Sequence, residues 1–283
     1  MIYNISGSKL NAVFNTNGGS INEAYSIDGS VIFPDLPIPT GDLNADSQIA
    51  LPDIYNNGHG WTCTGLAYDP QTNTFLVGDI GKELPSSVGF ASQIVRVSYD
   101  FSSVVGEIPL SATFTSMQDV QGITIDTSDG TIWLCSPSEN KIHHINSNGQ
   151  NLGSISITKP TGIAYSFKDD SLWVLNYNNK ILHITKSGTT YETYDFAYSD
   201  TLDQCFLDAE KGYLYITAGA NYTGRNNVYL FDINTHHQSI TCTVDSYSVE
   251  GIWIGADRMV IVNDGYYHSA TVQVNQANIY QLD

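Results

Sequence analysis

The feature that most constrains the fold is a two-strand unit that occurs five times between residue 64 and the end of the sequence. Each unit has a short apolar strand, a turn rich in Asp, Gly or Asn, and a second apolar strand. The units begin at Thr64, Gln121, Thr161, Gln204 and Glu250. Successive starts lie 57, 40, 43 and 46 residues apart. Because one such unit cannot bury a face alone, the units must pack against one another.

Further strands follow each unit. Five third strands are recognisable as QIVRVSYD, KIHHIN, KILHIT, NVYLFD and NIYQLD, and four fourth strands as VVGEIPL, LGSISI, TYETYDF and QSITCTV. Four antiparallel strands that recur at this period are typical of a β-propeller blade. No window shows the 3.6-residue periodicity of an amphipathic helix. We therefore predict an all-β chain whose main domain, residues 48–283, is a β-propeller.

The number of blades follows from the ends of the repeat. The fifth unit stops after its third strand, and QIALPDIY at residues 48–55 resembles a fourth strand. If this segment completes the last blade, the N-terminal strand closes the ring and removes an exposed sheet edge. We predict five four-stranded blades. Six blades are the alternative, because the first spacing is long; we attribute that length to an insertion, GDIGKELPSSVGFAS.

A shorter repeat occupies residues 1–35. Tyr3, Phe14 and Tyr25 each open an 11-residue unit, with Gly four positions later and Leu or Ile seven positions later. Asn-Gly and Asp-Gly supply tight turns, so each unit is predicted to form a short β-hairpin. Eleven residues must stack on neighbours or on partner chains. We expect an attachment or oligomerisation leader, with a homotrimer as the expected assembly; an unstructured leader is the alternative.

Residues 36–47 are predicted to be a linker, since they are rich in Pro, Asp, Asn and Gly. Asp42, Asn44, Asp46 and Asp53 fall at positions 1, 3, 5 and 12 of a calcium-binding loop, although Ser47 stands where that loop has glycine. Calcium is the one cofactor for which the sequence offers ligands. We expect no other cofactor. An ordinary linker has the same composition, so both interpretations stay open.

Charge and composition exclude several classes of function. The chain has 283 residues, with 11 Lys and Arg against 29 Asp and Glu, and a formal net charge of −18. Such a chain has no electrostatic affinity for nucleic acid or an anionic membrane. No apolar stretch is long enough to cross a membrane, and the N-terminus lacks the features of a secretion signal.

The four cysteines form no C-x-x-C pair and are predicted to be small buried apolar residues.

The candidate binding site lies where the five blades meet. The first residue of each unit and the residue that ends its second strand are mostly polar, although their strands are apolar. The loops nearby combine Tyr with Asn, Asp and Ser, and such residues suit sugars by stacking and hydrogen bonding. The predicted ligand-binding residues are His59, Trp61, Gln121, Asn176, Tyr177, Gln204, Asn221, Tyr222, Glu250, Asn263, Tyr266 and Tyr267. The alternative is that Asn makes turns and Tyr packs the blades.

Catalysis has no local motif in this sequence. There is no G-x-S-x-G elbow, no H-E-x-x-H and no glycine-rich phosphate loop. A pair of carboxylates across the channel is the remaining route to glycoside hydrolysis. Glu250 and Asp79 are the charged members of the two polar columns and therefore the candidate catalytic pair, with Asp119 and Asp203 as further acids. We favour a binding protein over an enzyme.

Two resemblances refine this hypothesis. The segment GIAYSFKDDSLWVLN and its equivalents resemble NHL-repeat propellers, a broad group that includes the regucalcin-like lactonases. The latter resemblance implies a channel metal, for which Glu250, Asn176 and Asn263 are the nearest match, in an order that does not fit cleanly. The 11-residue units are similar to the leaders of tail-fibre and receptor-binding proteins of bacteriophages that infect Firmicutes.

The second resemblance implies a place and a partner. A tail-associated protein assembles in the host cytoplasm without a signal peptide and becomes part of the virion. It binds a bacterial cell-surface polysaccharide, and residues 1–35 would attach it to other tail or baseplate proteins. We expect no nucleic acid partner and no membrane insertion. The alternatives are a glycan hydrolase or lyase, a metal-dependent lactonase-like hydrolase, and a peptide-binding scaffold.

Overall fold

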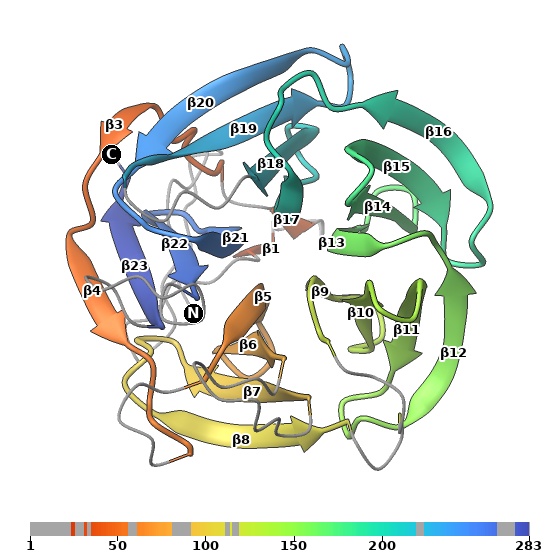
Figure 1. The fold of residues 1–283 in the computed structure, drawn as a ribbon, viewed down its shortest axis with the longest axis horizontal. Coiled ribbons are helices and arrows are strands. Elements are labelled where there is room, and N and C mark those ends of the chain that lie inside the picture. Colours follow the sequence, from red (N-terminus) through yellow and green to blue (C-terminus); the bar gives the residue numbers. More distant parts are fainter. Residues whose placement is uncertain are drawn as a thin grey trace.

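A computed structural model describes residues 24–25, 31–32, 35–55, 61–80, 92–110, 114, 119–218, 224–264 and 275–282. These residues form only strands, turns and loops. Five sheets stand in a ring, and the first strand of each lies nearest the centre (Figure 1). The prediction of a five-bladed β-propeller is therefore confirmed, and the six-bladed alternative is wrong.

The four strands of each blade pair antiparallel, and in blades 1 to 4 they run outward in chain order. Blade 1 comprises β5 (Cys63–Asp69), β6 (Thr74–Asp79), β7 (Gln93–Ser98) and β8 (Val104–Pro109). Blade 2 comprises β9 (Ile123–Ile125), β10 (Ile132–Ser136), β11 (Lys141–Ile145) and β12 (Asn151–Ser156). Blade 3 comprises β13 (Pro160–Ser166), β14 (Ser171–Asn176), β15 (Lys180–Thr185) and β16 (Thr190–Asp195).

The N-terminal segment completes the last two blades (Figure 1). Blade 4 comprises β17 (Leu202–Asp208), β18 (Tyr213–Ala218), β19 (Asn226–Asp232) and β20 (Gln238–Val244). Its outer edge carries β3 (Gly41–Leu43) as a fifth, parallel strand. Blade 5 comprises β21 (Val249–Ile254), β22 (Arg258–Asn263), β23 (Gln276–Gln281) and β4 (Ser47–Ala50).

The pairing of β4 with β23 confirms that an N-terminal strand closes the ring, with Ala50 opposite Gln276. Part of the predicted linker is thus built into the propeller as β3. In the leader, β1 (Ala24–Tyr25) pairs with β2 (Val31–Ile32), as expected for a short hairpin in the third 11-residue unit. The first unit, and all of the second except Ala24, lie outside the described residues.

The core lies between neighbouring blades. Between blades 1 and 5, the ring of Phe75 packs 4.7 Å from Phe101 and 5.0 Å from Trp253, measured between ring centroids. All four cysteines are buried, as predicted, and are free thiols.

Glycines bring the inner strands close together near their starts. A Cβ on Gly65 would lie 2.3 Å from the Gln121 carbonyl oxygen, and one on Gly122 would lie 2.4 Å from that of Thr161. The backbone N–H of each glycine donates to the same oxygen, at 2.9 and 2.6 Å. Only a residue without Cβ permits this approach. We call this level the glycine ring; it separates two ends of the channel that have different linings.

Candidate functional site

The strand starts carry a group of acidic residues at one end of the channel. Asp203 and Glu250 are the second residues of β17 and β21, Asp264 directly follows β22, and Tyr177 directly follows β14. In a propeller, the start of the first strand and the end of the second lie at the same rim. We call Asp119, Tyr177, Asp203, Glu250 and Asp264 the acidic mouth.

Glu250 is the most deeply placed acid of this group, with 5% of its surface exposed. Burial raises the pKa of its carboxyl well above the ordinary value, and Asp203 and Asp264 act in the same direction through charge and, for Asp203, a hydrogen bond. Its Oε2 atom has no hydrogen-bond partner within the described part of the chain. Glu250 therefore favours the protonated form and retains an unused acceptor.

Tyr177 provides an aromatic surface at the same end, with 42% of the residue exposed. Burial of its hydroxyl raises the pKa of the phenol, and the charges of Asp203, Glu250, Asp119 and Asp264 raise it further. The hydroxyl thus lies within electrostatic reach of four carboxyl groups, while part of the residue remains open to solvent. A ligand that enters the channel from this side meets Tyr177 together with carboxyl oxygens.

Two acids of this rim are fixed by their neighbours. Asp119 accepts hydrogen bonds from the Ser136 hydroxyl at 2.8 Å and from the Ser138 backbone N–H at 3.0 Å. Asp79 is fully buried and accepts from the Tyr55 hydroxyl and from Nε2 of Gln93, the latter at 3.3 Å. Burial and then the Asp79 charge raise the pKa of Tyr55. Asp79 thus serves a local hydrogen-bond network, and the acid that hydrogen-bonds Glu250 is Asp203.

The other predicted ligand-binding residues have mixed positions. The Gln121 carbonyl belongs to the glycine ring, and Asn176 Oδ1 accepts from the N–H groups of Asn178 and Lys180 at 3.0 and 3.1 Å. Gln204 and Asn263 are buried beside the acidic mouth. Trp61 is a core residue whose Nε1 donates to the Pro52 carbonyl. The remaining predictions lie outside the described residues: His59, Asn221, Tyr222, Tyr266 and Tyr267.

Among the acids at this end of the channel, Asp119 and Asp203 were predicted from the sequence as further channel acids, and the structure adds Asp264. The charges of Asp119, Asp203 and Asp264 all raise the pKa of the Tyr177 hydroxyl. The sequence carried a signal for two of them: Asp203 directly precedes Gln204, and Asp264 directly follows Asn263, so both adjoin the polar columns.

The predicted calcium ligands hold the N-terminal segment against the propeller. Asp42 accepts from the Thr243 hydroxyl, Asn44 Oδ1 from Arg225 Nη1 at 2.8 Å, and Asp46 Oδ2 from the Gln281 N–H at 2.7 Å. Across the described ranges, no group of three or more His, Cys, Asp or Glu is placed to hold a metal ion. Calcium binding by these residues and Asp53 stays a prediction.

The opposite end of the channel holds an apolar pocket, which the sequence analysis did not anticipate. It encloses about 1030 Å³, including its open mouth, and the last residues of all five inner strands line it. These wall segments are 66–68, 123–125, 163–165, 205–208 and 253–254. Leu36, from the N-terminal segment, lies at its edge. The second half of each inner strand is apolar, and this pattern in the sequence could have indicated the pocket.

Comparisons with known proteins agree on the fold. No protein-family model and no curated protein matches the chain. It is similar to Myxococcus xanthus glutaminyl cyclase, with a TM-score of 0.56 and 10% identity over 86% of this chain and 100% of that one. It is also similar to a chain of a nidogen/laminin complex, with a TM-score of 0.53 and 14% identity over 72% of each chain.

These likenesses define the class of protein: a β-propeller. The chain spans 60% of the length of the U3-55K chain and 63% of that of the RRP9 WD40 repeats, at TM-scores of 0.47 and 0.49 and 14% identity. Identities this low show the fold alone, because propellers serve many unrelated functions. The likenesses do not single out NHL-repeat propellers or phage tail proteins.

No helix in the described part of the chain is long and apolar enough to span a membrane.

Proposed function

We propose that this chain is a phage tail-associated receptor-binding propeller, which recognises a bacterial cell-surface glycan at the acidic mouth. The observation that carries the proposal is the partly exposed Tyr177 beside four carboxyl groups. Sugars stack their C–H faces on aromatic rings and donate hydroxyl hydrogen bonds to carboxylates. Glu250 offers a buried acceptor at the same place, and no described residue donates to it.

Two further features support a glycan and a tail. The net charge of −18 disfavours phosphate-rich polymers and favours ligands that bind by hydrogen bonding. The 11-residue units at the N-terminus resemble the leaders of tail-fibre proteins, and the Ala24–Ile32 pairing of β1 with β2 agrees with such a hairpin. We propose that this leader attaches the propeller to other tail or baseplate proteins in the virion.

A glycan hydrolase is the second candidate, and the raised pKa of the Glu250 carboxyl favours it. Glycoside hydrolysis requires a general acid that stays protonated and a second carboxyl group about 5 Å or more away. Glu250→Gln separates the two functions, because it removes the acidic proton and keeps the shape of the side chain. An enzyme would lose turnover, whereas a receptor-binding protein would show no turnover before or after the change.

The binding test compares two tyrosines. The full chain, Tyr177→Ala and Tyr191→Ala are applied to an array of bacterial cell-surface polysaccharides. Tyr191 is the matched control, since it is 56% exposed on the outer strand β16, away from the channel. We expect Tyr177→Ala to weaken binding at least about tenfold, as is usual for a central aromatic residue, and Tyr191→Ala to bind like the wild type. Wild-type binding by Tyr177→Ala would contradict the proposal, as would a wild type that binds no glycan.

A further inference from the structure

Three equivalent aspartates open the turns between first and second strands. Asp69 ends β5, Asp126 follows β9 and Asp208 ends β17. In each turn Oδ1 accepts a backbone N–H two or three residues later, from Gln71 at 3.0 Å, Ser128 at 2.9 Å and Lys211 at 3.1 Å. The fold therefore uses the same carboxylate oxygen in the same way in blades 1, 2 and 4.

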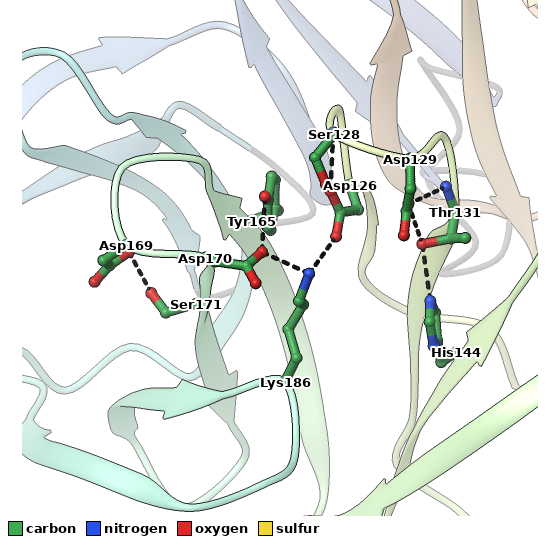
Figure 2. Close-up of polar contacts among 10 residues, drawn as sticks. All are labelled: Asp126, Ser128, Asp129, Thr131, His144, Tyr165, Asp169, Asp170, Ser171 and Lys186. Carbon is green, nitrogen blue, oxygen red and sulfur yellow. Dashed lines mark hydrogen bonds and ion pairs between the residues drawn. The ribbon is translucent and has the colours of Figure 1, made fainter.

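In blades 1 and 2 the other oxygen binds a cation. Arg96 Nη1 lies 2.5 Å from Asp69 Oδ2, and Lys186 Nζ lies 2.9 Å from Asp126 Oδ2. Figure 2 shows Lys186 reaching Asp126 from the neighbouring blade, with Asp170 as its second partner. Burial opposes ionisation of both aspartates, but hydrogen bonds from the cation and from a nearby hydroxyl outweigh it and lower the pKa of each carboxyl.

Asp208 in blade 4 differs in its second oxygen. It is 5% exposed, and its Oδ2 has no hydrogen-bond partner in the described ranges. Lys211 Nζ lies 4.0 Å away and is held by Asp35 at 3.0 Å and by the Leu36 carbonyl. Burial raises the pKa of Asp208. A buried carboxylate that lacks a close cation is costly, so this position is incomplete relative to its two equivalents.

Asp208 is also the one aspartate of the three that lines the apolar pocket. Tyr68, Tyr165, Phe206 and Trp253 contribute aromatic rings to the same wall. Aromatic faces attract cations and pack against apolar groups. About 190 Å³ of the pocket space is enclosed, which is comparable to cavities that bind a benzene-sized molecule. The wall therefore combines an apolar surface with one acid whose nearest described cation, Lys211, lies 4.0 Å away and also pairs with Asp35.

We propose that the apolar pocket binds a small organic ammonium ion whose amino group pairs with Asp208 and whose apolar body fills the space between the inner strands. The ligand supplies the cation that Arg96 and Lys186 supply to Asp69 and Asp126. This site lies on the other side of the glycine ring from the acidic mouth. It is therefore independent of the proposed glycan binding.

The first experiment compares matched ligands on the full chain. Binding of 2-phenylethylamine, tryptamine and hexylamine is measured by ligand-observed NMR and titration at neutral pH, alongside 2-phenylethanol, tryptophol and hexanol. We expect amines to bind at least about tenfold more tightly than their alcohols, since a charge-assisted hydrogen bond replaces a neutral one. A panel in which no amine binds more tightly than its alcohol would overturn the proposal.

Two isosteric variants locate the effect. Asp208→Asn removes the charge from the pocket wall, and Asp126→Asn makes the same change at the equivalent turn outside the pocket. We expect the amine preference to vanish in Asp208→Asn and to persist in Asp126→Asn. If Asp208→Asn folds poorly, Phe167→Ala replaces it; Phe167 is 37% exposed in the pocket lining, and its loss should weaken all probes about threefold or more. An amine preference retained by Asp208→Asn, or undiminished binding by Phe167→Ala, would count against the site.

Discussion

At the scale of single residues, Glu250 determines the character of the acidic mouth. Its carboxyl is buried beside Asp203 and Asp264, so the folded state binds a proton more tightly than the unfolded chain does. A group with a raised folded-state pKa contributes stability that is complete below its unfolded pKa and is lost as pH rises through the folded pKa. Glu250 therefore costs the protein stability under neutral and alkaline conditions.

Glu250→Gln should consequently stabilise the protein in a pH-dependent manner. We expect a gain of about 1–3 kcal/mol at pH 8, or several degrees in Tm, and little difference at pH 4, where both side chains are neutral. Thermal unfolding at the two pH values measures the effect. Glu107→Gln, on the exposed face of β8, is the control and should show no such trend. A Glu250→Gln protein with an equal shift at both pH values would refute the assignment.

At the scale of elements, the glycine ring explains why the repeat has glycine after its first residue. Gly65, Gly122, Gly162 and Gly251 each place an added Cβ within 3.0 Å of a neighbouring blade. Blade 4 has Cys205 at this position, and there the Thr217 hydroxyl donates to the Glu250 carbonyl at 2.8 Å. The glycine of the repeat thus reflects backbone packing between blades.

Gly122→Ala should be strongly destabilising for this reason. The new Cβ would lie 2.4 Å from the Thr161 carbonyl oxygen and 2.8 Å from the Ile163 nitrogen, both backbone atoms that cannot turn away. We expect a loss of at least about 2–3 kcal/mol in denaturant unfolding. Gly106→Ala is the matched control, because its Cβ meets only Arg96 at 3.8 Å, and it should change stability by less than about 1 kcal/mol.

The strands also show which features of the fold and the site could be predicted from the sequence. Strand pairs, blade number and closure by β4 were predictable because alternating apolar strands and turn residues repeat along the chain. The strand β3 was not, since Gly41–Leu43 is short and polar and its pairing depends on Arg225 and Thr243 of blade 4. Glu250 and Tyr177 were identified as site residues, but Asp264 and the apolar pocket depend on how five distant strands converge.

At the scale of the whole molecule, the channel has two chemically different ends. One is the acidic mouth at the strand starts, and the other is the apolar pocket at the strand ends. The glycine ring lies between them. Outer strands close the perimeter with bulges that expose Val105, Leu152 and Tyr191, which blunts the sheet edges. A polymer that binds this propeller at the acidic mouth leaves the pocket accessible.

Hydrogen exchange with and without the best polysaccharide from the array locates the surface that binds it. We expect slower exchange in peptides that contain Tyr177, Asp203 and Asp264, and unchanged exchange in residues 151–156 of β12 and in residues 206–210 at the pocket. Protection confined to the outer strands or to the pocket would contradict this expectation, as would an exchange pattern that the polysaccharide leaves unaltered.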